Sequence, residues 1–333
     1  MYNSGLHRFS VVTAVSTFLL IFLGGLVTST GSGLAVPDWP TTYGENMFTY
    51  PIDKWVGGIK YEHGHRLFAS FVGLLTMVLA VWLGIVEKRK WVRMLGYTAF
   101  GLVIAQGILG GITVLFLLPT PVSVAHGMTA QIFFCIISSI ALITSQWWYR
   151  EEKIDFPDMK RNTILALVAS AFVFMQLLFG AILRHTYSGL AVPDFPFAYG
   201  QLFPALSDVA LQEYNQELIR TGIKWTGDKP IESYQIVIHL LHRYWAYAVA
   251  LVLLYTGYAL QRSGGRTHTL SQNGKIIIAA VTIQFILGML TVLTRKEIII
   301  TTAHVAVGAL TLVVCIVTTI QLIKIRKGTT HNG

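Results

Sequence analysis

Eight long apolar segments, separated by short polar ones, dominate the chain. Each is close to the roughly 20 residues that cross the hydrocarbon core of a bilayer as a helix. None alternates as a transmembrane β-strand does, and only helices and closed barrels satisfy their backbone hydrogen bonds in lipid. The pattern therefore predicts an all-α membrane protein with eight transmembrane helices. The predicted spans are residues 9–28, 58–86, 95–118, 122–148, 163–183, 234–260, 276–294 and 298–323.

The composition agrees with a membrane protein. Of the 333 residues, 53% are hydrophobic and 12% are charged, and the mean hydropathy is +0.59. An ordinary soluble domain has about twice that charged fraction. The first apolar segment follows Arg8 and ends among small residues, as a signal peptide does, but a similar segment recurs near residue 175, where it cannot be cleaved. We therefore interpret both segments as structural helices.

Lysine and arginine residues mark one side of the membrane. Most lie in segments at alternate ends of consecutive spans, and such an excess of positive charge is typical of cytoplasmic loops. Both termini are therefore predicted to be cytoplasmic, and the loops after the first and fifth spans to face outward. The net charge of +9 fits contact with anionic lipid better than binding of nucleic acid. The positive segments are Arg8 and residues 88–93, 150–161, 262–275 and 324–327.

The two halves of the chain repeat each other. Residues 32–40 read SGLAVPDWP and residues 188–196 read SGLAVPDFP, with eight of nine letters identical. Residues 106–115 (QGILGGITVL) likewise resemble residues 284–293 (QFILGMLTVL). Because each half has an even number of spans, the copies share one orientation, about an axis along the membrane normal. The predicted domains are an N-terminal four-helix bundle at 1–149, a cytoplasmic linker at 150–161 and a C-terminal four-helix bundle at 162–333.

The second half has a longer outward loop, residues 201–233. Within it, residues 207–222 begin with Ser and Asp, carry apolar residues at helical spacing and end at a Gly. This pattern predicts a short helix lying on the surface.

Four of the histidines inside the predicted spans recur at equivalent positions of the two halves, each within roughly two turns of the outer end of its helix. An ionisable side chain at membrane depth costs up to about 2.5 to 3.5 kcal/mol, so it indicates a function. A neutral histidine bonded to a carbonyl would explain any one of them. It explains four poorly, because they form pairs on the second and fourth helix of each half. The four are His65, His126, His242 and His304.

Paired imidazoles in an apolar bundle suit haem better than zinc. Zinc needs more ligands, and Cys135 and Cys315 are isolated and not equivalent in the repeat. Haem takes one or two axial ligands, an apolar slot and a cation near its propionates. Arg66 and Arg243 directly follow the histidines of the second helix of each half. The sequence therefore predicts one haem site in each bundle, with these arginines near the propionates.

Three helices carry a glutamine four residues before a glycine. Small residues at such spacing usually permit close helix packing, and we interpret these glycines in that way, with interhelical hydrogen bonds from the glutamines as an addition. The pairs are Gln106 with Gly110, Gln176 with Gly180, and Gln284 with Gly288.

Together, the outward loops, the paired histidines and the EHGHR segment at 62–66 resemble the heme A synthase family over nearly the whole chain. The resemblance implies oxidation of the C8 methyl group of haem O to a formyl group by two successive hydroxylations, after which the geminal diol loses water. It also implies that substrate haem O binds in the first half at His65 and His126. A permanent haem b at His242 and His304 would relay electrons.

Glu62 distinguishes the two halves, because its counterpart in the repeat is His239. Positions 62 and 65 lie on one helix face, and a partly desolvated carboxylate there could manage protons as a catalytic group or hold the substrate. Glu62 could instead be an interfacial carboxylate paired with Lys60 or Arg66.

Three further histidines lie near the outward loops. His63 and His239 adjoin the assigned ligands, and either could replace its neighbour as a ligand. His185, the counterpart of Ser29, is expected at the membrane interface.

The two SGLAVPD loops are interpreted as lids over the outer ends of the bundles. Glycines allow tight turns and prolines stiffen the path, and we expect Asp38 and Asp194 to accept hydrogen bonds from backbone amides within the loops. The lids would exclude water and close the haem slots, so both aspartates are predicted to support cofactor binding. A structural turn without functional contact is the alternative.

The resemblance leaves two other classes of protein open. The chain could be a two-haem b-type cytochrome for electron transfer, or a haem carrier. Some bacterial members of the family have cysteine pairs in their outward loops; this chain has none there, so a thiol step does not transfer.

The partners and the location follow from the same reasoning. The resemblance implies haem O synthase and an electron donor as partners, in addition to the lipid bilayer. A homo-oligomer is an arrangement that the sequence allows. The start of the chain lacks an Arg/Ser-rich transit segment, which favours a bacterial plasma membrane over a mitochondrial one.

Overall fold

The computed structural model describes residues 2–150, 158–223, 229–263 and 268–330. Within them the chain forms eight long helices and no β-strand, and all eight are long and apolar enough to cross a membrane. The prediction of an all-α chain with eight spans is confirmed. The long helices are α1 (Ser4–Ser29), α2 (Ile59–Val86), α3 (Lys90–Leu115), α4 (Thr120–Ile143), α6 (Met159–His185), α8 (Ser233–Ser263), α9 (His268–Leu293) and α10 (Ile298–Thr330).

Several helix ends differ from the predicted spans, and two of the differences have a clear local cause. Helix α3 ends at Leu115 rather than at 118, because Leu117 and Leu118 adopt left-handed backbone angles (φ 58° and 60°) and terminate it. The predicted span 122–148 is divided: α4 ends at Ile143, and a short helix α5 (Gln146–Tyr149) starts anew. The Ser145 side chain causes the restart by accepting a hydrogen bond from the amide of Trp148.

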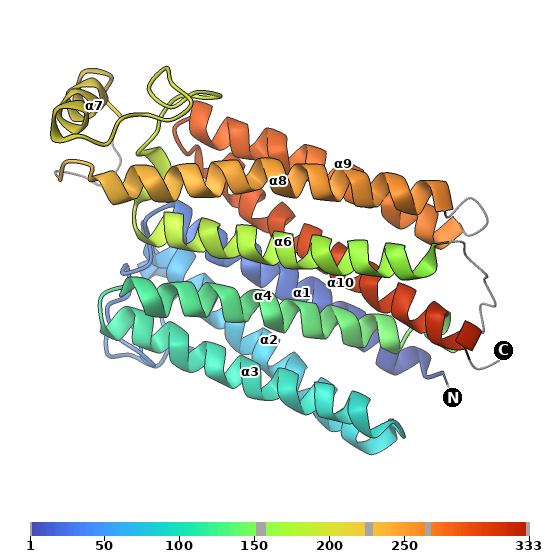
Figure 1. Cartoon of the computed structure of the whole chain (residues 1–333). Coiled ribbons are helices and arrows are strands. Elements are labelled where there is room, and N and C mark those ends of the chain that lie inside the picture. The colour runs from blue at the N-terminus through green and yellow to red at the C-terminus, as the bar shows by residue number, and fades with distance from the viewer. Residues whose placement is uncertain (1, 151–157, 224–228, 264–267, 331–333) are drawn as a thin grey trace.

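The long helices pack as two rings. In the N-terminal half, α2 and α4 each contact both α1 and α3, so α2 and α4 lie diagonally across the ring. In the C-terminal half, α8 and α10 each contact both α6 and α9 and are likewise diagonal. Figure 1 shows the two groups side by side, with contacts of α1 and α4 to α10 and of α4 to α6.

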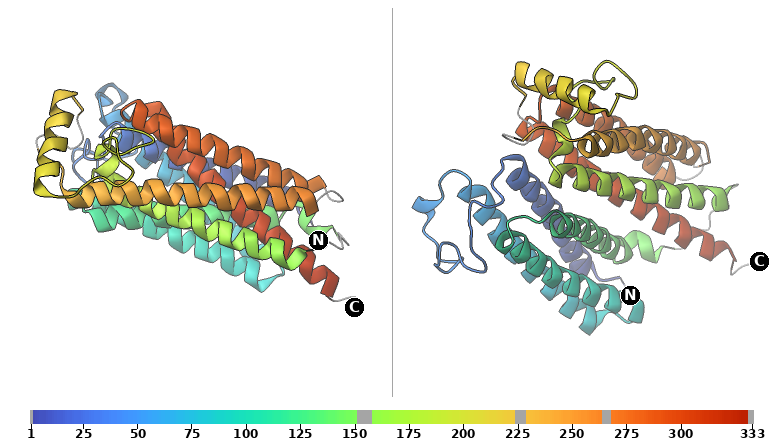
Figure 2. Two further views of the ribbon diagram at one scale, coloured as in Figure 1. Left: turned by 45° about the horizontal axis from the view of Figure 1, so that its top comes forward. Right: turned by 60° about the vertical axis from the view of Figure 1, so that its left-hand side comes forward.

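Both described ends of the chain lie at one end of the bundle, and the loops that follow α1 and α6 lie at the other (Figures 1 and 2). One apolar cluster in each half lies among the long helices and includes Leu83 and Ile140 in the first half and Leu260 and Leu322 in the second. A third apolar cluster, with Leu190 and Leu218, lies at the second outward loop. The polar groups described below lie toward the loop end.

The outward loops carry three short helices: η1 (Ile52–Lys54), η2 (Ser188–Leu190) and α7 (Asp208–Arg220). Helix α7 confirms the surface helix expected at 207–222; the Ser207 side chain caps it, and Tyr214 stacks on Tyr199 at 3.8 Å between ring centroids. Residues 151–157 of the predicted linker at 150–161 lie outside the described residues.

Candidate functional site

Each of the four membrane histidines lies against a glycine of a neighbouring helix. A Cβ atom at Gly24 would be 3.1 Å from Cε1 of His65, and one at Gly288 would be 3.0 Å from Cε1 of His304. The corresponding distances are 3.4 Å between Gly110 and His126, and 3.1 Å between Gly180 and His242. The interpretation of Gly110, Gly180 and Gly288 as helix-packing residues alone is therefore wrong, because these glycines make room for imidazole rings.

The histidines form two opposed pairs. His65 on α2 and His126 on α4 come from diagonal helices and are close enough to interact electrostatically. His242 on α8 and His304 on α10 have the same relation. The structure therefore brings together the four residues selected from the sequence, in the pairs that the sequence predicted.

The two nitrogens of these rings differ in their surroundings. Nδ1 of His65, His126 and His304 is buried without a hydrogen-bond partner among the described residues. In the fourth ring, that of His242, both nitrogens lie 3.2 Å from the side-chain amide nitrogen of Gln176. A haem-ligating imidazole binds iron through one nitrogen while the other faces the protein. The arrangement fits haem.

Glutamines fix the backbone beside two of the histidines. The Gln106 side chain donates to the carbonyl of His126 at 3.0 Å, and the Gln176 side chain donates to the carbonyl of His242 at 3.2 Å. Groups of three or more metal-binding side chains, as zinc requires, do not occur among the described residues. The donor set is therefore one of paired imidazoles.

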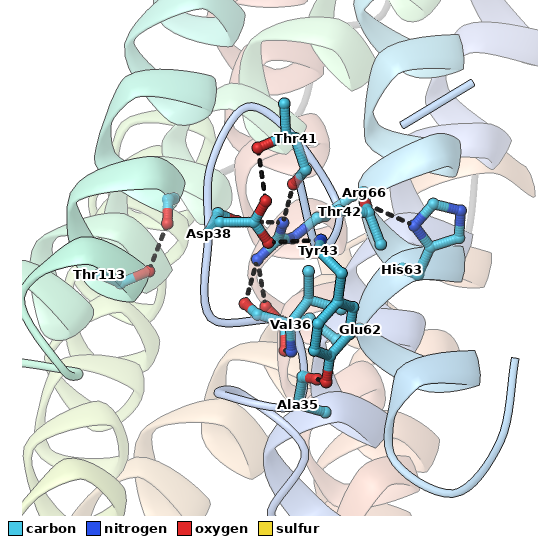
Figure 3. A network of polar contacts seen from close by, with 11 residues as sticks. Ala35, Val36, Asp38, Thr41, Thr42, Tyr43, Glu62, His63, Arg66 and Thr113 are labelled. Atoms are coloured by element: carbon cyan, nitrogen blue, oxygen red, sulfur yellow. Dashed lines mark hydrogen bonds and ion pairs between the residues drawn. The ribbon is translucent and has the colours of Figure 1, made fainter. Parts of the chain in front are cut away.

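Arg66 holds the first outward loop (Figure 3). Its guanidinium donates to the carbonyls of Asp38 (2.7 Å), Thr41 (3.2 Å) and Val36 (2.8 Å), and to the Glu62 carboxylate (2.5 Å). The contact with propionates predicted for Arg66 stays a prediction; the groups that surround it belong to the loop and to Glu62.

Arg243 holds the second outward loop in a similar way. Its guanidinium donates to the carbonyls of Phe197 (2.7 Å) and Asp194 (2.9 Å) and meets Nε2 of His239 at 2.8 Å. The residue is only 6% exposed. Its predicted contact with propionates likewise stays a prediction.

The two aspartates close equivalent turns. Asp38 accepts hydrogen bonds from the amides of Tyr43 and Gly44, both at 2.8 Å, and from the Thr41 hydroxyl. Asp194 accepts from the corresponding amides, of Tyr199 at 2.9 Å and Gly200 at 3.0 Å. The expected hydrogen bonds to backbone amides are confirmed.

The hydrogen bonds of the turn favour the ionised form of Asp38. Burial raises the pKa of this carboxyl, but hydrogen bonds from Thr41, Gly44 and Tyr43 together hold it below its ordinary value. The left-handed backbone of Tyr43 (φ 52°) and Gly44 (φ 77°) points both amides at the carboxylate.

Glu62 joins the first loop to the helix that carries His65. The residue is 4% exposed and accepts from the amide of Val36 at 2.8 Å in addition to Arg66. Of the two cations proposed for it, Arg66 is the partner, while the ammonium of Lys60 lies over the ring of Tyr61.

The neighbouring histidines hold the loops. Nδ1 of His63 meets the Thr42 hydroxyl at 3.0 Å, and its ring packs against that of Trp55. Both ring nitrogens of His239 have protein partners, the Ser188 carbonyl at 3.0 Å and Arg243. The arrangement of His239 therefore leaves no free ring nitrogen for a replacement ligand. Nε2 of His63 is buried without a hydrogen-bond partner, so His63 as a replacement ligand stays a prediction.

The sequence missed a polar seam between the halves. Arg184, at the end of α6, donates to the carbonyl of Gly25 at 3.0 Å and to the hydroxyl of Ser29 at 2.8 Å, both on α1. Thr120 donates to the carbonyl of His185 at 3.0 Å, which places His185 at the outer end of this seam. An arginine at the end of an apolar span was the available signal.

Paired imidazoles across two rings of membrane-spanning helices define a multi-pass membrane protein suited to binding haem. The chain matches the COX15-CtaA family, described as cytochrome oxidase assembly protein, over residues 7–57 and 58–316. The protein belongs to this family.

Curated relatives named heme A synthase are similar over most of their length. The protein of Rhizorhabdus wittichii is 26% identical over 93% of this chain and 91% of its own, and that of Sphingopyxis alaskensis is 24% identical over 92% and 88%. The protein of Alkalihalophilus pseudofirmus is 28% identical over 65% of this chain and 72% of its own.

Proposed function

We propose that the protein is a heme A synthase, an oxidoreductase that converts the C8 methyl group of haem O to a formyl group. The proposal is carried by one observation: four imidazoles, each against a glycine, form two pairs across helical rings. Membership of the cytochrome oxidase assembly family and the relatives named heme A synthase support it. Bound haem iron supplies the redox chemistry that amino-acid side chains lack.

The two halves would have different tasks. Substrate haem O binds between His65 and His126 in the domain at 1–149, and haem b binds between His242 and His304 in the domain at 162–333. The assignment follows a charged difference beside the ligands, where Glu62 in the first half replaces His239 of the second.

The chain's own residues position the substrate and exclude water. The imidazoles would hold the haem, and the loops anchored by Arg66 and Arg243 would cover the outer ends of the rings. Glu62 is the candidate catalytic carboxylate. Its hydrogen bonds to Val36 and Arg66 couple the closed loop to the helix of His65, so that proton transfer through Glu62 would depend on loop closure.

The membrane arrangement belongs to the same proposal. The halves are tandem repeats in one orientation, supported by the matching contacts of their helices and by the matching turns at Asp38 and Asp194. Both termini face the cytoplasm, in agreement with the positive segments. Haem O synthase and an electron donor are the expected partners, and a homo-oligomer is compatible with this arrangement.

Pigment extraction tests the function. The protein is expressed with and without haem O synthase in a host that lacks its own heme A synthase, and the haems are extracted and separated. We expect haem A only when haem O is available. Protohaem alone under both conditions would contradict the enzyme and support the two-haem cytochrome or the carrier.

A further inference from the structure

The turn between the third and fourth long helices has the same backbone shape in both halves, but it is uncharged in the first half and positively charged in the second. Leu117 and Leu118 connect α3 to α4, and Arg295 and Lys296 connect α9 to α10, all four with left-handed backbone (φ 58°, 60°, 55° and 63°). A Cβ atom at Gly33 would lie 3.5 Å from Leu118, and one at the equivalent Gly189 would lie 3.3 Å from Lys296. Lys296 therefore takes the place that leucine has in the first half.

A second cation distinguishes the C-terminal half at the same level. Arg184 occupies the position equivalent to Thr28. It is close enough to Lys296 and to His304 for electrostatic interaction. The outer end of the C-terminal ring therefore has two neighbouring positive charges that the N-terminal ring lacks.

Neither cation forms an ion pair among the described residues. The ion pairs there join other residues, and Arg184 bonds only to neutral groups of α1. The Lys296 ammonium makes no hydrogen bond or ion pair within the described residues, although the backbone amide of Lys296 donates to the carbonyl of Thr291 at 2.8 Å. Burial together with Arg184 lowers the pKa of the ammonium. Partly buried charges of one sign are costly without an anion, so the pair suits an anionic ligand.

The position of Arg184 and Lys296 relative to the histidines indicates which anion they bind. Arg184 is close enough to His304, which we assign to haem, for electrostatic interaction. Arg66 and Arg243 each donate to three loop carbonyls, whereas Arg184 donates to one carbonyl and one hydroxyl of α1. We propose that Arg184 and Lys296 bind the propionate carboxylates of the haem in the C-terminal half. Leu118 and Thr28 leave the N-terminal haem without equivalent pairs, so that substrate and product exchange there while the C-terminal haem is retained. The proposal rests on the proposed function.

Haem transfer to excess apomyoglobin measures retention in the purified full-length protein. We expect a fast phase from the N-terminal half and a slow phase from the C-terminal half. Lys296→Leu, which copies the first half and should therefore fold, and Arg184→Gln should each accelerate the slow phase about tenfold, the order expected for loss of one charge-assisted hydrogen bond. The converse variant Leu118→Lys should slow the fast phase.

Two controls test whether the effect depends on the propionate groups of the haem. Arg295→Leu removes an exposed charge from the same turn and should leave the slow phase unchanged. Protein loaded with the dimethyl ester of protohaem, which lacks propionate charge, should release it at one rate in the wild type and in Lys296→Leu. An equal acceleration for haem and for its ester would overturn the proposal, because Lys296 would then act only on structure.

The remaining outcomes separate the causes. An unchanged slow phase in both variants, in protein that still makes haem A, would refute the propionate site and leave the proposed function intact. Wild-type protein without haem in either half would refute the proposed function itself. An effect of Lys296→Leu that disappears when phosphatidylglycerol is removed would identify a lipid phosphate as the anion and overturn the assignment to propionates.

Discussion

Gly288→Ala tests the role of the glycines beside the histidines. The added Cβ would lie 3.0 Å from Cε1 of His304, whereas carbon atoms prefer about 3.5 to 4.0 Å. The ring or the helix must therefore move by several tenths of an ångström. Overpacking of this kind costs about 1 to 3 kcal/mol, and alanine in place of a helical glycine returns about 1 kcal/mol. The net loss of stability is expected to be about 0 to 2 kcal/mol.

The effect on the ligand should exceed the effect on the fold. We expect Gly288→Ala to shift the low-spin signal of the C-terminal haem in electron paramagnetic resonance spectra and to lower haem content, with little change in the unfolding temperature. Gly64→Ala and Gly127→Ala are matched controls, because each glycine adjoins a histidine in sequence but has nothing within 4 Å of an added Cβ. Spectra of Gly288→Ala that match those of the controls would refute the reasoning.

The remaining predictions concern the first outward loop and its equivalent. Asp38→Ala and Asp194→Ala should each lower haem retention in the apomyoglobin assay; unchanged retention in both would contradict the lids. Because hydrogen bonds lower the pKa of Asp38, its stabilisation of the loop is complete above about pH 4 and is lost as the pH falls through the lowered pKa. Amide hydrogen exchange of Gly44 should show this loss. Asp38→Asn should abolish the pH dependence of the exchange. Glu62→Ala should reduce the free energy of unfolding by about 3 kcal/mol, because it leaves Arg66 buried without its ion pair. Glu62→Gln keeps a hydrogen-bond acceptor and should reduce it less in denaturant titrations. Equal losses in the two variants would disprove the anchoring role of Glu62.

The order of polar and apolar residues was sufficient for the eight spans and for the paired histidines. Span length is set by bilayer thickness, and an imidazole at membrane depth is rare enough to stand out. Helix ends were less predictable. Leu117 and Leu118 are apolar and continue the predicted span, yet their left-handed backbone ends α3.

Contacts between helices could not be derived from spacing within one helix. The spacing of Gln106 and Gly110 is the same whether the glycine meets a backbone or a ring, and only the position of His126 on another helix decides. Arg66 likewise has a long side chain that reaches either the haem level or the loop, and the carbonyls of the loop determine its direction in the structure.

The most direct test of the paired imidazoles is the haem content of single variants. His65→Ala, His126→Ala, His242→Ala and His304→Ala are purified from cells that supply haem, and haem per protein and the low-spin spectrum are measured. We predict that each variant loses the bis-imidazole signal of its own half and keeps that of the other. Wild-type spectra and haem content in all four variants would contradict haem ligation by these residues.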